Sequence, residues 1–264
     1  QYLCPGVGGW NQWMNLVENS YKNIARMCGY ARKYHAEGVL NTDWGDCGHI
    51  NQPDFSLPGM IYGAVFSWGD DTDSFEELNE QISRLAYDRS GKFVSYMAKT
   101  AECSIFDWWD ANVVYEEKVL GHPNNRNALF DARIQDEAKR AAAKETIAAL
   151  KKELKKTAGA LEESCRPMVP VLELTMEAID IWNETGARLC DIELGKEKDE
   201  AACAALAGRL ETWFMKYKAS WRSISKEGDL HHIAEIVFWY ADILRGRKKS
   251  VCKQNEQKKR INER

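Results

Sequence analysis

A cluster of acidic and aromatic residues, NTDWGDCGH at positions 41–49, has the composition of a carbohydrate site. A pyranose presents one face of C–H groups and a rim of hydroxyls. Trp44 offers a flat apolar surface for that face, and Asp43 and Asp46 flank it with carboxylates that accept hydrogen bonds from hydroxyls. His49 closes the cluster. The alternative is a tight turn in which the carboxylates cap backbone amides, and from the residue types alone the turn is the more frequent of the two.

The residues around this cluster predict a strand before it and a helix after it. Residues 38–40 start a short apolar run, which we expect to be a buried strand. Residues 57–68, LPGMIYGAVFSW, combine small residues that permit close packing with large apolar residues that supply a buried face. In a parallel barrel, acids, aromatic residues and glycines gather at the carboxyl ends of the strands, so the cluster has the expected position.

The preceding segment repeats this order. Residues 2–4 form a short apolar run, which breaks at a glycine-rich loop ending in Trp10. Asn11 is a predicted N-cap for a helix whose apolar residues then recur every three or four positions. Strand, helix, strand, helix is the repeat of a parallel α/β sheet. Two such units cannot close an eight-stranded barrel, and the chain opens at Gln1 without methionine, so we expect a carboxy-terminal piece of a longer protein.

Three motifs, CPGVGGW at 4–10, NTDWGDCGH at 41–49 and LPGMIYGAVFSW at 57–68, resemble the bacterial glycoside hydrolase family 20 enzymes, the β-N-acetylhexosaminidase group. They are similar to the seventh strand, eighth strand and eighth helix of that family's barrel. The resemblance implies that Trp44 walls the pocket of the terminal sugar and that Asp46 binds its outer hydroxyls. Two features depart from the family pattern: Asp46 replaces the more usual Glu, and 4–10 has no clear match for the tyrosine that contacts the acetamido group.

The resemblance implies removal of a terminal sugar from a glycan or glycoside, without metal or cofactor. The substrate's own acetamido oxygen would attack the anomeric carbon while a glutamic acid protonates the leaving oxygen. No residue here matches the family's catalytic Asp-Glu pair, so we expect this chain to be inactive alone and to contribute pocket walls and hydroxyl contacts. For Trp44 and Asp46, carbohydrate binding is favoured over a structural turn. Asp43 and His49 fit a sugar contact and a turn equally, and Trp10 fits core packing at the barrel rim slightly better than sugar binding.

The rest of the chain has helical patterns. Ser74 with Glu77 predicts a capping box, and a long amphipathic pattern covers 126–163. The predicted fold class is therefore mainly α: the last two βα units of a (β/α)8 barrel, followed by an antiparallel helical bundle. The predicted domains are the barrel portion at 1–72, the bundle at 73–246 and a basic, disordered tail at 247–264.

Composition limits the classes of partner. The net charge is −4, which provides no global basic field for nucleic acid, and no apolar run is long enough to span a membrane. The eight cysteines are too dispersed for a zinc or redox motif and suggest a reducing compartment, so we expect a cytoplasmic protein. Two strands without neighbours would leave an open edge, which the missing amino-terminal barrel portion or a second copy of the chain would cover. The alternative function is a non-catalytic helical interaction module with a vestigial barrel edge.

Overall fold

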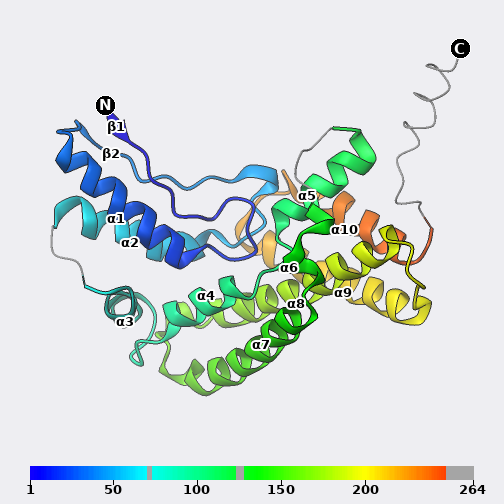
Figure 1. Cartoon of the computed structure of the whole chain (residues 1–264). Coiled ribbons are helices and arrows are strands. Elements are labelled where there is room, and N and C mark those ends of the chain that lie inside the picture. The colour runs from blue at the N-terminus through cyan, green and yellow to red at the C-terminus, as the bar shows by residue number, and fades with distance from the viewer. Residues whose placement is uncertain (70–72, 123–127, 248–264) are drawn as a thin grey trace, which may run out of the picture. The chain divides into compact units, whose positions relative to one another are not determined.

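The structure is a computed structural model that describes residues 1–69, 73–122 and 128–247. It is mainly helical, with 71% of residues in helices, ten α-helices in the described ranges and a sheet of two short parallel strands. The chain divides into two compact units, each built from two stretches: 1–104 with 141–179, and 105–140 with the residues from 180 onward. Figure 1 labels the elements along the chain, and each unit is described by itself.

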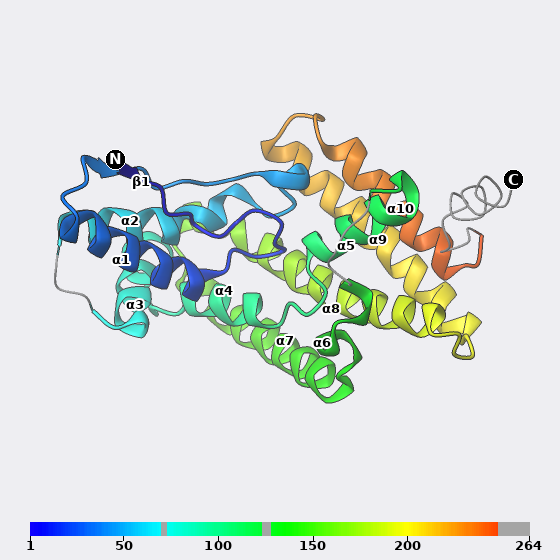
Figure 2. The same ribbon diagram turned by 45° about the horizontal axis from the view of Figure 1, so that its top comes forward.

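The first unit opens with two consecutive βα units. β1 (Tyr2–Leu3) precedes α1 (Val17–Lys33), and β2 (Gly38–Val39) precedes α2 (Leu57–Trp68). The strands pair in parallel, with Tyr2 opposite Gly38 and Leu3 opposite Val39. Figures 1 and 2 both show α1 and α2 side by side below the strands. The predicted order of strand, helix, strand and helix is confirmed.

Small residues let α2 approach the segments that follow the strands. A Cβ atom on Gly59 would lie 2.6 Å from Cβ of Val7, and one on Gly63 would collide with the side-chain amide of Asn41. That amide donates a hydrogen bond to the Gly59 carbonyl, 2.9 Å away. The glycines of α2 therefore serve the close packing that the sequence predicted for this helix.

An aromatic cluster joins the first three helices of this unit. Tyr21 of α1 makes edge contacts with Tyr62 and Phe66 of α2 and with Phe75 of α3 (Phe75–Ala86), at ring centroid separations of 5.3 to 5.6 Å. Such pairs contribute about 0.5–1.5 kcal/mol each beyond the area that they bury. α4 (Phe93–Glu102) follows, and the first unit also contains the larger part of α7 (Glu137–Thr157) and the first part of α8 (Met168–Glu193).

Of the two helix starts predicted from capping residues, one is confirmed and one is wrong. The capping box predicted before α3 is present: the Ser74 hydroxyl accepts a bond from the Glu77 amide at 3.3 Å, and the Glu77 carboxylate accepts one from the Ser74 amide at 3.0 Å. The N-cap predicted at Asn11 is wrong, because α1 begins only at Val17. Asn11 instead has a left-handed backbone with φ of 60° and a buried side chain, since the chain turns there before the helix starts.

The strand predicted at residues 38–40 was expected to be buried, but the strand pair is partly exposed to solvent. Tyr2 is 66% exposed, Leu40 directly after β2 is 59% exposed, and Val39 is half-buried. Helices cover the strands on one side only, and each of the two strands has a single neighbour. The expectation of burial was wrong, because an apolar strand sequence does not show whether helices or strands cover both faces of that strand.

The long helical pattern predicted over 126–163 is divided in the structure. α6 (Ala132–Gln135) is followed by Asp136, whose backbone is extended. The Asp136 carboxylate accepts a hydrogen bond from the Lys139 amide at 2.9 Å, in the first turn of α7. After α7, a 3-10 turn spans Ala158–Ala160. Ile134 of α6 is buried, and the next buried residue is Ala143 of α7, so the spacing of buried residues changes at the break between α6 and α7. Residues 126 and 127 lie outside the described part.

The second unit is built around a buried tryptophan. It contains α5 (Trp108–Tyr115), α6, the later part of α8, α9 (Glu200–Ile224) and α10 (Leu230–Leu244). Trp182 of α8 is fully buried and contacts the rings of Trp108, Phe106 and Tyr240. Both views show α9 and α10 running antiparallel and side by side. The mainly helical class is thus confirmed for the described chain.

The predicted domain boundaries stay predictions. The first unit contains residues on both sides of position 72, and its two stretches are interleaved with those of the second unit. The basic tail predicted at 247–264 lies, from residue 248, outside the described residues. Within the described ranges, no helix combines the length and the apolar character needed to cross a bilayer, and no disulfide joins the cysteines there.

An ion pair connects α9 with α10 in the second unit and makes its stability depend on pH. Arg245 donates two hydrogen bonds to the Glu211 carboxylate, at 2.5 and 2.6 Å. These bonds lower the pKa of Glu211. A carboxylate with a lowered folded-state pKa stabilises the fold above its unfolded pKa of about 4.3, and this contribution is lost as the pH falls through the folded value.

Glu211→Gln is therefore expected to lower the free energy of unfolding by about 0.5–1 kcal/mol at pH 7, the range for pairs near the surface, and by less at pH ~3. Urea unfolding at both pH values measures this difference. Glu235→Gln, an exposed substitution on α10, is the control and should show no comparable change with pH. An effect of Glu211→Gln that is equal at both pH values would contradict the prediction.

Candidate functional site

The candidate site lies where the chain leaves the two parallel strands. The backbones stay paired beyond the strands: Gly6 and Thr42 form a further parallel bridge, and the Val7 amide donates to the Thr42 carbonyl at 2.9 Å. The loop that ends in Trp10 and the loop that starts at Asp43 therefore emerge at the same end of the sheet. The register of the pair brings together two segments that are more than thirty positions apart in the sequence.

Two exposed tryptophans adjoin the bridge between Gly6 and Thr42. Trp44 is 55% exposed, and its indole N–H donates to the Thr42 hydroxyl at 2.8 Å; that hydroxyl donates to the Pro5 carbonyl at 2.8 Å. Trp10 is 37% exposed, and its ring lies over Gly6, where a Cβ atom would be 2.7 Å from ring atom Cζ3. The hydrogen bonds fix the Trp44 indole while leaving ring surface available to solvent.

The three polar candidates take different positions around these rings. Asp43 and Asp46 are exposed, and one carboxylate oxygen of Asp43 lies 3.1 Å from the position that a Cβ atom on Gly9 would occupy. The Asp43 carboxylate is thus close to the loop that carries Trp10. His49 is half-buried with its imidazole over Gly45, and its Nε2 atom is buried without a hydrogen-bond partner in the described structure.

A buried network of side chains that sequence analysis missed holds the first loop in place. The Asn15 amide donates to the Val7 carbonyl and to the Ser56 hydroxyl, both at 3.1 Å. The Asn51 amide donates to the Gly9 carbonyl and to the Asn15 side-chain oxygen, both at 2.8 Å. Each element of the network comes from a different part of the first 56 residues, so both loops are fixed to the same scaffold.

One polar residue on the buried face of α1 completes this support. The Ser20 hydroxyl donates to the Val7 carbonyl at 2.6 Å and to the Leu16 carbonyl at 2.8 Å. Ser20 falls between Val17 and Ile24, which are both buried on the same helical face. The sequence did contain a signal for this supporting contact: a serine lies within the apolar face of the helix, and a buried hydroxyl needs a hydrogen-bond partner.

Backbone strain is concentrated in the two loops. In the described chain, the non-glycine residues with left-handed backbones are Asn11, Cys47 and His49, in these loops, and His35 at the end of α1. Side-chain oxygens of Asn11 and Asn51 and the His49 Nε2 atom are also buried without hydrogen-bond partners in the described ranges. Strained backbone and unsatisfied buried polar atoms cost free energy and gather at functional sites.

The chemistry available at this end of the sheet suits ligand binding. Two aromatic surfaces and two exposed carboxylates can provide stacking and hydrogen-bond acceptors for a polyhydroxylated molecule. Across the described residues, no group of three or more His, Cys, Asp or Glu side chains is arranged to hold a metal ion. No protein-family model matches the chain, and the search of curated proteins found no match. The assignment of a function therefore depends on the residues and their geometry.

Proposed function

We propose that this chain is the carboxy-terminal portion of a glycoside hydrolase, similar to the β-N-acetylhexosaminidases of family 20, which removes a terminal sugar from a glycan or glycoside. The observation that carries the proposal is the exposure of Trp10 and Trp44, with Asp43 and Asp46, at the carboxyl end of a parallel strand pair. In this proposal residues 1–72 are the last two βα units of the barrel, and residues 73–246 are the bundle.

In this proposal the chain binds sugar and does not cleave it. The Trp44 ring packs against the apolar face of the terminal sugar, because its indole is fixed through Thr42. The Asp46 carboxylate accepts hydrogen bonds from the outer hydroxyls, and Asp43 and Trp10 line the same pocket. His49 contributes a ring nitrogen that has no protein partner in the described structure. The catalytic Asp-Glu pair belongs to an earlier strand outside this sequence, and no cofactor or metal takes part.

The exposed edges of the strand pair support the proposal that another polypeptide segment covers the strands. Tyr2 and Leu40 expose apolar surface beside strands that each have only one neighbour. Exposed strand edges recruit further strands. The amino-terminal barrel portion, or a second copy of the chain, would cover this surface and complete the walls of the sugar pocket. The proposed location is the cytoplasm, with neither nucleic acid nor membrane as a partner.

Titration of 15N-labelled protein with N-acetylglucosamine, followed by NMR of the indole N–H groups, tests the proposal. We expect the Trp44 indole resonance to shift in a saturable manner, because a sugar on that ring changes the field at its N–H. Asp46→Asn should weaken the apparent affinity by roughly tenfold, since a hydrogen bond to a charged group contributes about 1.5–3 kcal/mol. The indole resonance that is missing from the spectrum of Trp44→Phe is the one that belongs to Trp44.

Trp68 provides a matched control. It is 93% exposed and lies at the end of α2, beside the residues that begin β2, so it faces the opposite end of the strand pair. Its indole resonance should not respond to the sugar. The alternative function, a non-catalytic helical interaction module with a vestigial barrel edge, predicts no response at Trp44. Equal shifts at Trp44 and Trp68, or none at either, would refute the sugar site.

A further inference from the structure

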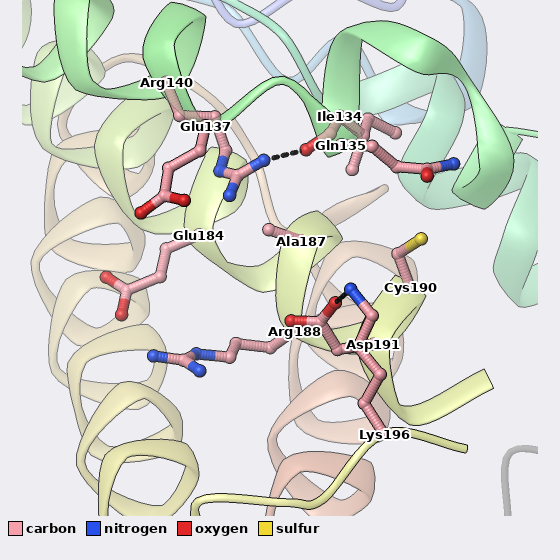
Figure 3. A pocket seen from close by; sticks show the side chains of 10 residues that line it. All are labelled: Ile134, Gln135, Glu137, Arg140, Glu184, Ala187, Arg188, Cys190, Asp191 and Lys196. Carbon is pink, nitrogen blue, oxygen red and sulfur yellow. Dashed lines mark hydrogen bonds and ion pairs between the residues drawn. The ribbon is translucent and has the colours of Figure 1, made fainter. Parts of the chain in front are cut away.

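A cavity of about 360 Å³ lies within the second unit, apart from the strand-end residues. Figure 3 shows its lining, which comes from α6, the first turn of α7, the later part of α8 and the turn after it. The volume lies in the range of about 300–1,000 Å³ that is usual for small-molecule sites. Seven of the lining side chains are polar or charged: Gln135, Glu137, Arg140, Glu184, Arg188, Asp191 and Lys196.

Two of the three carboxylates in this lining take part in ion pairs. Asp191 pairs with Lys196 at 2.7 Å, as the dashed line in Figure 3 shows. Glu184 pairs with Arg209 at 2.6 Å; Arg209 lies outside the lining and also pairs with Asp180 at 2.6 Å. Arg140, Arg188 and Glu137 are the charged residues of the lining that stand outside these ion pairs.

The two arginines have no carboxylate partner in the described part of the chain. A guanidinium nitrogen of Arg140 donates to the backbone carbonyl of Ile134. Arg188 makes neither a hydrogen bond nor an ion pair within the described ranges, although it is half-buried. Figure 3 shows the two arginines extending from α7 and α8, with the small Ala187 on the wall between them. A half-buried guanidinium carries five donors and a permanent charge, so it favours a negatively charged partner.

We propose that this cavity binds a small organic anion whose carboxylate or phosphate oxygens are held by Arg188 and Arg140. Guanidinium groups match both oxyanions in geometry and form charge-assisted hydrogen bonds with them. Glu137, on the exposed rim, would accept a hydrogen bond from a hydroxyl or amino group of the same molecule. The site is separate from the sugar-binding residues, so it does not depend on the function proposed above.

The cavity is suited to binding rather than to covalent chemistry. Its cysteine, Cys190, is buried, and burial raises the pKa of the thiol, with Asp191 acting in the same direction. The thiolate is the nucleophilic form of cysteine, so a raised pKa leaves this side chain inert near neutral pH. The remaining apolar lining residues, Ile134 and Ala187, offer only packing surface.

Thermal unfolding of the whole chain in sodium phosphate, sodium succinate and sodium chloride at equal ionic strength tests the proposal. We expect a saturable rise in Tm with phosphate, succinate or both, and a smaller, unsaturated response to chloride; comparison of the first two identifies the preferred oxyanion. Arg188→Gln should raise the apparent Kd at least about tenfold, because charge-assisted hydrogen bonds are lost. Arg166→Gln, an exposed arginine of the first unit, is the matched control and should titrate like the unmodified protein.

Ala187→Met provides a second variant that keeps every charge while filling the cavity, and it should abolish the saturable response, whereas Arg188→Gln should weaken it. If circular dichroism shows that Arg188→Gln does not fold, the response of Ala187→Met alone tests whether the anion binds in the cavity. A general salt effect would persist in both variants. The proposal is overturned if neither oxyanion exceeds chloride in the unmodified protein, or if a folded Arg188→Gln or Ala187→Met protein responds as the unmodified protein does.

Discussion

Trp182→Ala is expected to lower the free energy of unfolding of the second unit by about 3–5 kcal/mol, the usual loss when a fully buried tryptophan is truncated. Trp182 has no exposed surface, and its ring packs against Phe106, Trp108 and Tyr240 at centroid separations of 6.4, 5.8 and 4.9 Å. The substitution removes these contacts and leaves a cavity that three rigid rings cannot fill. The expected loss is a large part of the stability of a typical domain.

Urea unfolding followed by near-ultraviolet circular dichroism measures this effect, because that signal reports the packing of aromatic rings. Trp68→Ala is the control: it removes the same side chain from a position that is 93% exposed, and should change the free energy by no more than about 0.5 kcal/mol. A loss below 1 kcal/mol for Trp182→Ala would mean that the cluster of rings is not the core of the second unit.

Asn15→Ala is expected to lower the free energy of unfolding of the first unit by about 2–4 kcal/mol, through loss of the three buried hydrogen bonds that its side chain makes. Asn15 is buried, donates to Val7 and Ser56, and accepts from Asn51. The substitution leaves those three groups without this partner. It should also weaken the sugar response of the Trp44 indole, since the loop that carries Trp10 is held through Val7.

Asn19→Ala is the matched control for this prediction. Asn19 is exposed on α1, four positions from Asn15, so its loss should have an effect within about 0.5 kcal/mol. Amide hydrogen exchange separates a local from a global effect: protection of the Gly8 to Trp10 amides should fall more than that of the α3 amides in Asn15→Ala. Equal stability of the Asn15 and Asn19 variants would show that the buried network does not support the site loops.

Elements with strong local signals could be predicted from sequence. Leu57–Trp68 forms the helix predicted there, and the capping box of Ser74 and Glu77 is present, because both depend on interactions within a few residues. The N-cap at Asn11 and the single pattern over 126–163 were wrong for a complementary reason. A periodic pattern shows which residues could share a helical face, but it does not show where the backbone leaves the helix.

The candidate site also has features that could be predicted from sequence and features that could not. Asp43, Trp44, Asp46 and His49 are adjacent in sequence, so their grouping required no fold. Their proximity to Trp10 depends on the parallel register of β1 and β2, which the order of elements predicted and the bridge between Gly6 and Thr42 extends. The support from Asn15 and Asn51 was not predicted, because asparagine commonly occupies exposed loops and only burial reveals that its amide must find partners.

The sequence by itself determined the mainly helical class and the local clustering of the polar and aromatic residues, since these follow from short-range periodicity and turn chemistry. It also predicted the parallel strand pair, through the order of strand, helix, strand and helix. Only the tertiary structure decided which apolar segments are covered, how the two loops are fixed, and that Arg140 and Arg188 share a cavity. Those features arise from contacts between residues distant along the chain, such as Asn15 with Asn51. Such contacts depend on how helices and loops pack in three dimensions, and no local pattern encodes that packing.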